Sequence, residues 1–471
     1  MKTRIEHDLL GMMEVPADAY YGIHTLRAHK NFDLSGIELH PELIRALAEV
    51  KKACALANMR TGHINKRIAE AITGACDEIA SGHLHDQFIT DVFQGGAGTS
   101  ANMNANEVIA NRAIEILGGI KGDYSIVHPL DHVNLAQSTN DVFPTAVKLA
   151  AIRLLIPVSK AASQLQRALQ EKENAFASVL KTGRTEMQDA VPITLGQEFA
   201  AWAQAVQRDW WRLYKVEERL RQVNLGGTAV GTGLNADQKY VYIVVDILRE
   251  ITGVPLARAE NMIDVTQNTD VFVEVSGLIK AAAVNLAKIA SDLRILSSGP
   301  KAGIGEIKLP ALQAGSSIMP GKVNPVATEA VSQAAFQIMA NDHAIAIAAM
   351  SGQLELNAFL PMLSHNLFQS LQLLQRSSLL LADKCVSGIE VDSERCCALV
   401  EGSFAILTAL SPHIGYEAAS ELALEAEKMG KTIRQVALEK GIFTKEQLDK
   451  ILSTVEMTKP GIAGAKAKTN K

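Results

Sequence analysis

One apolar pattern, from Gln267 to Ser297, limits the possible folds more than any other feature of the sequence. The segment contains no proline that would interrupt a helix. Its apolar residues are spaced alternately by three and four positions: Phe272, Val275, Ile279, Ala282, Leu286, Ile289, Leu293 and Leu296. Such a heptad seam predicts one long helix that packs against other helices along its length, about 45 Å at 1.5 Å per residue. A cluster of helix-breaking residues at 297–300 is expected to end it.

Four further long segments have a helical pattern, at 144–181, 192–223, 326–350 and 361–384. A kink is expected in the first of them at Pro157. The aromatic content is only 5%, against 48% hydrophobic residues, which favours helices packed on helices over a β-sandwich. The sequence therefore predicts a mainly α protein with an elongated bundle of long helices.

The expected bundle suggests a division into three domains. These are an N-terminal mixed, mostly helical domain at 1–140, the central long-helix bundle at 141–396, and a small C-terminal helical domain at 397–471. A bundle this long and this rich in alanine usually buries part of its apolar surface against other subunits. We therefore expect an oligomer.

Charge and composition argue against several classes of protein. The net charge of −5 is not that of a nucleic-acid-binding protein. No stretch approaches 18 uncharged apolar residues, so we expect no membrane span, and the first residues lack the apolar core of a signal peptide. Five cysteines without a Cys-x-x-Cys spacing indicate reduced thiols and a cytoplasmic location.

Residues 299–325 interrupt the helical pattern with five glycines and four prolines. Loops of this length inside a compact domain are usually functional or disordered. Apolar residues such as Ile304, Ile307 and Ile318 are not typical of a disordered linker. We therefore expect an ordered loop that opens and closes over a site.

The sequence motifs of zinc proteases, P-loop proteins, α/β-hydrolases and dinucleotide-binding proteins are absent. His83 and His85 form one close pair of histidines, and His128 and His132 form another. Neither pair has thiol or carboxylate partners at the spacing of metal ligands. We interpret them as surface or core histidines and expect no metal site.

Four polar, mostly glycine-containing segments stand out, at 95–104, 137–141, 183–189 and 315–325. They offer Ser, Thr and Asn side chains and one lysine, which is a set of donors suited to a small dicarboxylate. Taken singly, each segment fits a helix cap or a turn equally well. Asp141, shortly before Pro144, fits a structural cap especially well.

The sequence GSSIMPGKVN at 315–324 resembles the signature loop of the aspartase/fumarase superfamily position for position. The other three segments resemble the remaining conserved regions of this superfamily in the same order. The resemblance extends from DLLG at 8–11 to PGIAG at 460–464. Within the superfamily, GGAGTSANMN at 95–104 and QSTND at 137–141 are similar to the aspartase branch rather than to the fumarases.

This resemblance implies a three-domain, aspartase/fumarase-type fold whose central bundle is shared in a homotetramer. Each active site would draw its segments from three different chains. The implied reaction is the reversible deamination of L-aspartate to fumarate and ammonia, by anti elimination through an aci-carboxylate intermediate. The implied partners are these small molecules and further copies of the chain, and no metal or organic cofactor is needed.

The resemblance also implies a role for each candidate residue. Ser316 would be the general base, which requires that its alkoxide be stabilised by backbone N–H groups of the loop and by the charge of Lys322. The β-carboxylate would be held by Thr99, Ser138, Thr139 and Ser317. The α-carboxylate would be held by Thr185, Lys322 and Asn324. Asn140 and Glu186 would face the amino group.

Glu186 departs from the superfamily pattern, which usually has His or Gln at this position. It is either a tolerated exchange or the sign of a different substrate, such as an N-substituted or β-modified aspartate. A fumarate hydratase is the alternative enzyme. A non-catalytic helical oligomer, like the lens proteins descended from this superfamily, is the alternative from another class, and the intact serine loop argues against it.

Overall fold

The computed structural model describes residues 2–465, which form many helices and four small two-stranded sheets. The helices are α1 (Ile23–Asn31), α2 (Pro41–Arg60), α3 (Lys66–Ala80), α4 (Thr99–Ile116), α5 (Thr139–Ala175), α6 (Leu195–Val216), α7 (Gln238–Thr252), α8 (Met262–Gln267), α9 (Asp270–Leu296), α10 (Val326–Met350), α11 (Leu360–Leu379), α12 (Ser393–Gly402), α13 (Leu407–Ile414), α14 (Tyr416–Met429), α15 (Ile433–Glu439), α16 (Lys445–Ile451) and α17 (Thr454–Met457). The paired strands are β1 (Thr3–Asp8) with β2 (Gly11–Pro16), β3 (Leu180–Thr185) with β4 (Gln188–Thr194), β5 (Gln222–Val223) with β6 (Ala257–Arg258), and β7 (Ile307–Lys308) with β8 (Glu390–Val391).

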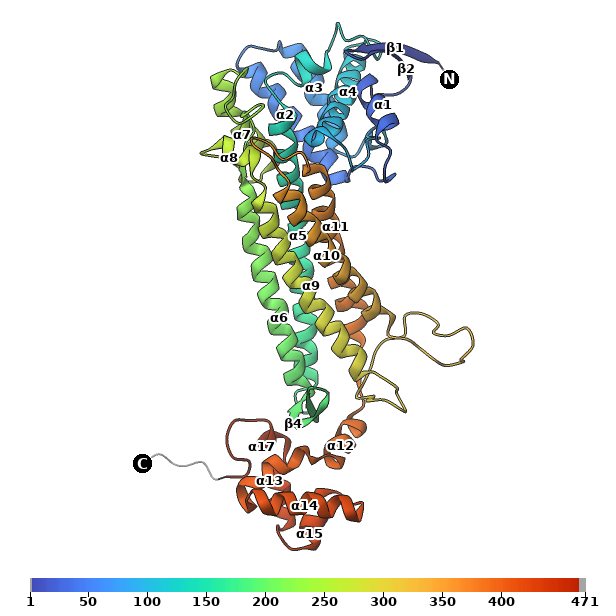
Figure 1. Ribbon diagram of the computed structural model, residues 1–471, viewed down its shortest axis with the longest axis vertical. Helices are drawn as coiled ribbons and strands as arrows, with labels where there is room; N and C mark the ends of the chain where they lie inside the picture. The colour runs from blue at the N-terminus through green and yellow to red at the C-terminus, as the bar shows by residue number, and fades with distance from the viewer. Residues whose placement is uncertain (1, 466–471) are drawn as a thin grey trace. The chain divides into compact units, whose positions relative to one another are not determined.

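The five predicted long helices are present as α5, α6, α9, α10 and α11, which run alongside one another in Figure 1. The expected bounds of α10 agree with the structure, and α5 continues as one helix through Pro157. The expected end of α5 at Lys181 is wrong, because the helix stops at Ala175 and the chain turns into the β3–β4 hairpin. The hairpin leads into α6, whose second residue is Gly196, and a Cβ on Gly196 would lie 2.5 Å from the carbonyl oxygen of Glu173.

The heptad seam of α9 is buried within the single chain. Each of its eight apolar residues is at most 5% exposed. This confirms the helix packing that the pattern predicted. It also means that the seam itself is not left open for another subunit.

The chain divides into two compact units. The first comprises Met1–Lys160, Trp211–Ala283 and Ala335–Gln375, and the second comprises Ala161–Trp210, Val284–Ala334 and Arg376–Lys471. Every long helix contributes to both units. The division into three domains stays a prediction, and residues 466–471 of the expected C-terminal domain lie outside the described residues.

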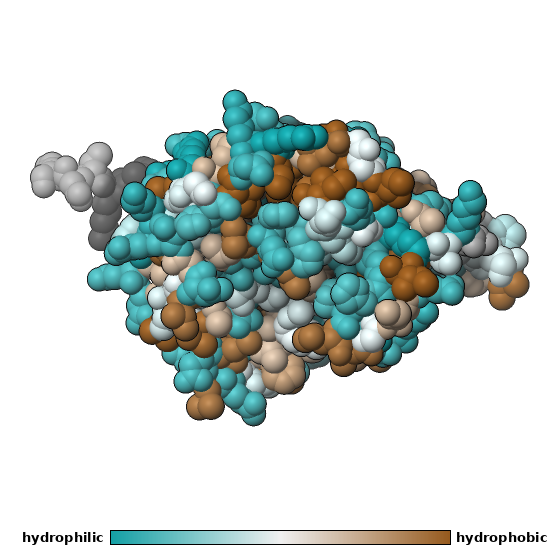
Figure 2. Space-filling view, turned by 90° about the horizontal axis from the view of Figure 1, so that it is seen from above, coloured by the Kyte–Doolittle hydropathy of each residue, from teal (hydrophilic) through white to brown (hydrophobic). Residues whose placement is uncertain are grey.

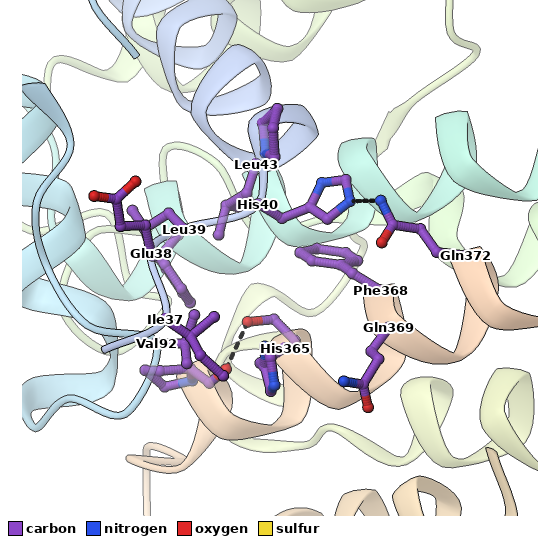
Figure 3. Close-up of a pocket in the computed structure, with 14 residues that line it drawn as sticks. Ile37, Glu38, Leu39, His40, Leu43, Val92, His365, Phe368, Gln369 and Gln372 are labelled. Carbon is purple, nitrogen blue, oxygen red and sulfur yellow. Dashed lines mark hydrogen bonds between the residues drawn. The ribbon is translucent and has the colours of Figure 1, made fainter. Parts of the chain in front are cut away.

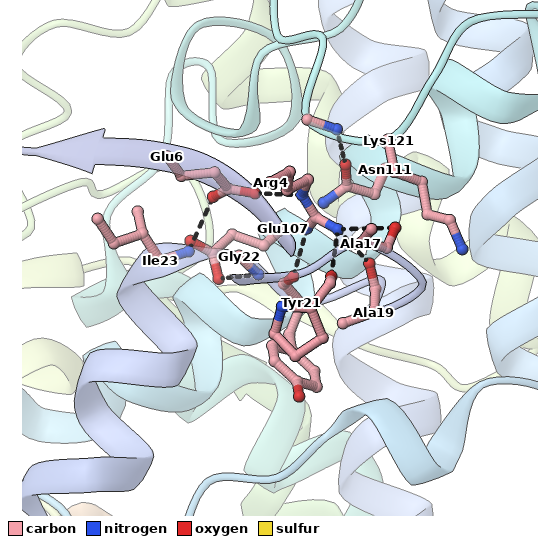
Figure 4. Close-up of polar contacts among 12 residues, drawn as sticks. Arg4, Glu6, Ala17, Ala19, Tyr21, Gly22, Ile23, Glu107, Asn111 and Lys121 are labelled. Carbon is pink, nitrogen blue, oxygen red and sulfur yellow. Dashed lines mark hydrogen bonds and ion pairs between the residues drawn. The ribbon is translucent and has the colours of Figure 1, made fainter. Parts of the chain in front are cut away.

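In the first unit, a buried carboxylate attaches α1 to α4. Glu107 of α4 accepts a hydrogen bond from Gly22 N at 2.8 Å (Figure 4). It also accepts from His24 N at 2.9 Å and from Thr25 Oγ1 at 2.6 Å. The two backbone N–H groups belong to the start of α1, where a carboxylate compensates the free donors and the helix dipole. Burial raises the pKa of Glu107. The attachment fixes α4, whose first residue is the predicted site residue Thr99.

Among single helices of residues 2–465, only α5 is long and apolar enough to span a membrane, with a mean hydropathy of 1.6 over its best window. Protein covers 78% of that window, as expected for a core helix. The face of the molecule in Figure 2 is mostly hydrophilic, with hydrophobic side chains in small groups between polar ones.

Candidate active site

Thr99 begins α4 directly after a left-handed turn at Gly98, which has a φ of 101°. A Cβ on Gly98 would lie 2.6 Å from the ring of Phe143, so a side chain at this position would displace the turn. The Thr99 hydroxyl donates to the carbonyl oxygen of Gly96 at 2.6 Å. Thr99 is exposed and therefore accessible to a ligand.

The predicted residues Ser138, Thr139 and Asn140 form the start of α5, and the buried Asp141 organises them. One Asp141 oxygen accepts from Ser138 N at 2.9 Å. The other accepts from two N–H groups of the 226–228 loop, at 3.0 and 3.2 Å. Burial raises the pKa of Asp141 to about 6, against the lowering effect of these N–H groups. Asp141 is thus a cap, as its position suggested, and it also joins two loops.

Behind this segment lies a buried network of amides around one lysine. Lys51 Nζ donates to Asn134 Oδ1 at 2.8 Å and to Gln137 Oε1 at 2.9 Å. Asn102 of α4 donates to Asn134 Oδ1 at 3.2 Å and to Thr139 Oγ1 at 3.1 Å. Burial lowers the pKa of Lys51 to about 8. The network ties α4 to the start of α5 and places a positive charge beneath the predicted carboxylate-binding residues.

A cavity of about 370 Å³ opens beside these residues in the first unit. Asn102, Ser138 and Thr139 line it together with Thr228 and Asn235. Most of these side chains can donate a hydrogen bond. The cavity is therefore suited to a small polar molecule that carries carboxylates.

Replacement of Asp141 by asparagine is expected to lower kcat/KM about fivefold at neutral pH for L-aspartate, the substrate that the sequence resemblance implies. The amide loses the charge that strengthens the N–H bonds from Ser138 and the 226–228 loop, a difference of about 1 kcal/mol. Since the carboxyl has a raised pKa of about 6, wild-type activity should fall as the pH drops through that value, and the variant should lack this loss. Profiles of kcat/KM against pH measure both the difference at neutral pH and the fall at low pH. Asp131→Asn, which changes an exposed residue, is the control. An unchanged acid limb in Asp141→Asn would contradict this role.

In the second unit, Thr185 and Glu186 form the tip of the β3–β4 hairpin. Thr185 pairs with Gln188, and Glu186 and Met187 form a two-residue turn with φ values of 54° and 63°. Neither turn residue is the Gly or Asn that such a turn favours, so the tip is strained. Thr185 and Glu186 are exposed. Backbone strain of this kind is commonly maintained at functional sites.

The loop between α9 and α10 carries Ser316 in a tight turn. Ser316 Oγ accepts hydrogen bonds from Ile318 N at 3.3 Å and from Met319 N at 3.0 Å. These two N–H groups point at the oxygen that would become an alkoxide if Ser316 lost its proton. The expected backbone stabilisation of Ser316 is therefore available within its own loop.

The two ends of this turn meet at Gly315. A Cβ on Gly315 would lie 1.5 Å from the carbonyl oxygen of Lys322, so only glycine allows this approach. Gly321, with a φ of 83°, brings the chain back. The side chains of Ser317 and Lys322 are exposed, and Asn324 is half-buried. Lys322 has no carboxylate partner among residues 2–465, which leaves its charge available for a ligand.

The ten predicted site residues are divided between the two units. The first unit contains Thr99, Ser138, Thr139 and Asn140, and the second contains Thr185, Glu186, Ser316, Ser317, Lys322 and Asn324. Lys51, Asn134 and the 226–228 loop were not predicted from the sequence. One signal was present for Lys51, because it stands on the apolar face of α2 with Leu47 and Ala55.

A second cavity in the first unit, of about 330 Å³, was not predicted. His40, His365 and Gln372 line it with several apolar side chains, and Figure 3 shows His40 and Gln372 in hydrogen-bond contact. It contains none of the predicted site residues. As for metals, residues 2–465 include no group of three or more His, Cys, Asp or Glu side chains arranged to hold an ion.

Comparison with known proteins extends over nearly the whole chain. A lyase family model matches residues 11–340, and a model of the fumarase C C-terminus matches residues 406–459. The aspartate ammonia-lyase of Bacillus subtilis is 51% identical over 98% of this chain and 97% of its own length. The aspartate ammonia-lyase of Escherichia coli is 46% identical over 97% of this chain and 96% of its own length.

Two solved structures agree with these relatives. The fumarate lyase:delta crystallin of Brucella melitensis, bound to cobalt, is 50% identical with a TM-score of 0.94, and covers 98% of this chain and 100% of its own. The class II fumarase of Schistosoma mansoni is 35% identical with a TM-score of 0.89, and covers 97% of this chain and 99% of its own. The family match, these relatives and the shared fold place the chain in the lyase family, within the aspartase/fumarase superfamily.

Proposed function

We propose that the chain catalyses the reversible elimination of ammonia from L-aspartate to give fumarate. The observation that carries this proposal is the Ser316 hydroxyl, which accepts two backbone N–H bonds in a largely exposed loop. The aspartate ammonia-lyases of Bacillus subtilis and Escherichia coli, similar along the full length, support the same reaction.

The reaction requires removal of a weakly acidic proton from Cβ, next to the β-carboxylate. Ser316 as an alkoxide takes this proton, and the N–H groups of Ile318 and Met319 stabilise the base before the transfer. The electron pair left on Cβ passes into the β-carboxylate, which becomes a doubly charged aci-carboxylate. Donors fixed in advance around that group lower the barrier most. The intermediate then re-forms the carboxylate, makes the double bond and breaks the C–N bond, so that the protonated amino group (–NH3⁺) leaves as neutral ammonia.

The proposed binding residues form three groups, which contact the β-carboxylate, the α-carboxylate and the ammonium group of the substrate. Ser138, Thr139 and Ser317 supply hydroxyl donors for the β-carboxylate, where negative charge develops. Thr99 joins them when its hydroxyl turns from Gly96 O to the ligand. Lys322, with Thr185 and Asn324, meets the α-carboxylate, whose charge does not change during the reaction. Asn140 donates an amide N–H to Ala229 O at 2.7 Å, so its carbonyl oxygen remains for the ammonium group.

A substrate panel separates this function from its alternatives. The purified protein is given L-aspartate, L-malate and N-alkyl aspartates, and fumarate is followed by its ultraviolet absorbance. Fumarate from L-aspartate alone is the expected result. Fumarate from L-malate would instead indicate a hydratase, and a preference for an N-alkyl aspartate would indicate a lyase of a modified aspartate.

Glu186 determines how well the amino group is held. Replacement by glutamine is expected to raise the KM for L-aspartate roughly fivefold, because a partly solvated ion pair contributes about 1 kcal/mol. In the reverse reaction the KM for ammonia rises as well, whereas the KM for fumarate does not. Asp189→Asn, which removes another exposed carboxylate of the same hairpin, is the control. Unchanged kcat and KM in Glu186→Gln would exclude the contact with the amino group.

The assembly proposed for the chain is a homotetramer in the cytoplasm. Helix α10 supports self-association, because Phe336, Ile347 and Met350 are 60%, 46% and 80% exposed although the helix also has a buried face. A helix that is apolar on all sides is normally buried. The five cysteines are free thiols, as in a reducing compartment. Light scattering on the eluting protein tests the assembly, and a monomer would contradict it.

A further inference from the structure

A buried group of charges joins the β3–β4 hairpin to the base of the 299–325 loop. We call it the Glu306 cluster, formed by Lys181, Arg184, Glu198 and Glu306. The Glu306 carboxylate pairs with Lys181 Nζ at 3.2 Å and with Arg184 Nη2 at 2.9 Å. Lys181 also pairs with Glu198 at 3.1 Å. The side chains of Glu306 and Lys181 are 0% and 2% exposed, and two cations balance two carboxylates, as buried ions require.

The shape of β3 brings both cations to one carboxylate. Lys181 and Arg184 are three positions apart, and on a regular strand such residues face opposite sides. The pairing of β3 with β4 is irregular between Thr182 and Arg184. A Cβ on Gly183, between them, would lie 2.5 Å from the carbonyl oxygen of Val191. Irregularities of this kind change the direction of side chains beside functional sites.

Backbone hydrogen bonds fix the same part of the loop from the other side. Glu306 N donates to Leu296 O at the end of α9, at 3.0 Å. Glu306 O accepts from Asp392 N at 2.9 Å. Arg395 of α12 donates to Ile304 O at 3.0 Å. The base of the loop is thus held by the end of α9 and by the 392–395 segment, in addition to the hairpin.

The β3–β4 hairpin and the 299–325 loop both continue from this base into predicted site residues. Arg184 is followed by Thr185 and Glu186 at the exposed hairpin tip, and the loop continues into the turn with Ser316 and Lys322. We propose that Glu306 is a positioning residue for the elimination of ammonia. Its carboxylate holds the hairpin and the loop base in one arrangement, so that both catalytic segments begin from a fixed point. This inference rests on the function proposed above.

The test is Glu306→Gln, which keeps the size of the side chain and removes its charge. With L-aspartate, kcat is expected to fall about tenfold to hundredfold, because small displacements of a reacting group have effects of this size, while KM changes little. The deuterium isotope effect with L-aspartate deuterated at Cβ should rise, since slower proton removal then limits more of the rate. Loss of stability alone would not change this isotope effect.

Asp342→Asn is the matched control. Asp342 of α10 is also a buried carboxylate, paired with Lys280 at 2.5 Å and bonded to Ser276 at 2.8 Å, but its partners lie on α9. Its kcat and isotope effect should equal those of the wild type. If Glu306→Gln also has the wild-type isotope effect, and the wild-type kcat when kcat is calculated per folded active site, the positioning role is overturned.

Two further measurements keep the proposal testable if the first fails. If Glu306→Gln does not fold, Arg184→Lys keeps the charge but loses the planar fork, and should change kcat and the isotope effect in the same direction. If the wild type does not act on L-aspartate, the proposed function fails, and hydrogen exchange still tests the cluster. Glu306→Gln, or Arg184→Lys in its place, should then exchange faster at both 183–189 and 303–309. Unchanged exchange at either segment would overturn the coupling.

Discussion

Replacing Ser316 by alanine is expected to lower kcat for fumarate formation from L-aspartate by about 10²–10⁴-fold, the usual contribution of a positioned general base. The hydroxyl is small, half-buried and bonded to N–H groups of its own turn, so its loss removes the base without opening a core cavity. KM should stay close to the wild-type value, because Ser316 acts on the proton and not on the carboxylates.

Ser298→Ala provides the control for this result. Ser298 lies at the start of the same loop, is also half-buried, and its hydroxyl accepts a backbone N–H bond from Ile304 at 3.2 Å. The variant thus loses a similar local bond without loss of the proposed base. Its kcat should match the wild type. Equal losses in both variants would assign the effect to loop structure, and wild-type kcat in Ser316→Ala would exclude the base.

Replacing Lys322 by methionine is expected to raise the KM for L-aspartate about 10- to 100-fold. A hydrogen bond to a charged group contributes about 1.5–3 kcal/mol, and Lys322 is exposed without a carboxylate partner among the described residues. The KM for fumarate should rise in the reverse reaction, since fumarate keeps the carboxylate, whereas the KM for ammonia should not.

Lys301→Met is the control for Lys322, because it removes an exposed lysine from the same loop. Initial rates in both directions give the three KM values. A rise in the KM for ammonia alone would assign Lys322 to the amino group and contradict its proposed contact with the α-carboxylate. Equal effects in both variants would indicate a general effect of charge on substrate attraction.

The long helices were predictable from sequence because periodicity reports directly on a buried face. The seam from Phe272 to Leu296 predicted α9, and α10 has the expected bounds. The end of α5 was not predictable, because the apolar pattern continues past Ala175 into β3. There the close approach of Gly196 to the preceding helix decides the path of the chain. Such tertiary contacts leave little trace in local sequence.

The candidate site was predictable as a set of segments, through the resemblance of the 315–324 loop, but its support was not. Asp141 was correctly interpreted as a helix cap, yet its bonds to the 226–228 loop depend on chain distant in sequence. Lys51 and Glu306 likewise contact distant partners. A single sequence contains the residue types of such networks but not their pairing.

The most direct test of the proposed elimination measures fumarate and ammonia together when the purified wild-type protein and Ser316→Ala are each given L-aspartate. We predict equal amounts of both products from the wild type and almost none from the variant. Fumarate formation by Ser316→Ala at the wild-type rate, or no products from the wild type, would contradict this prediction.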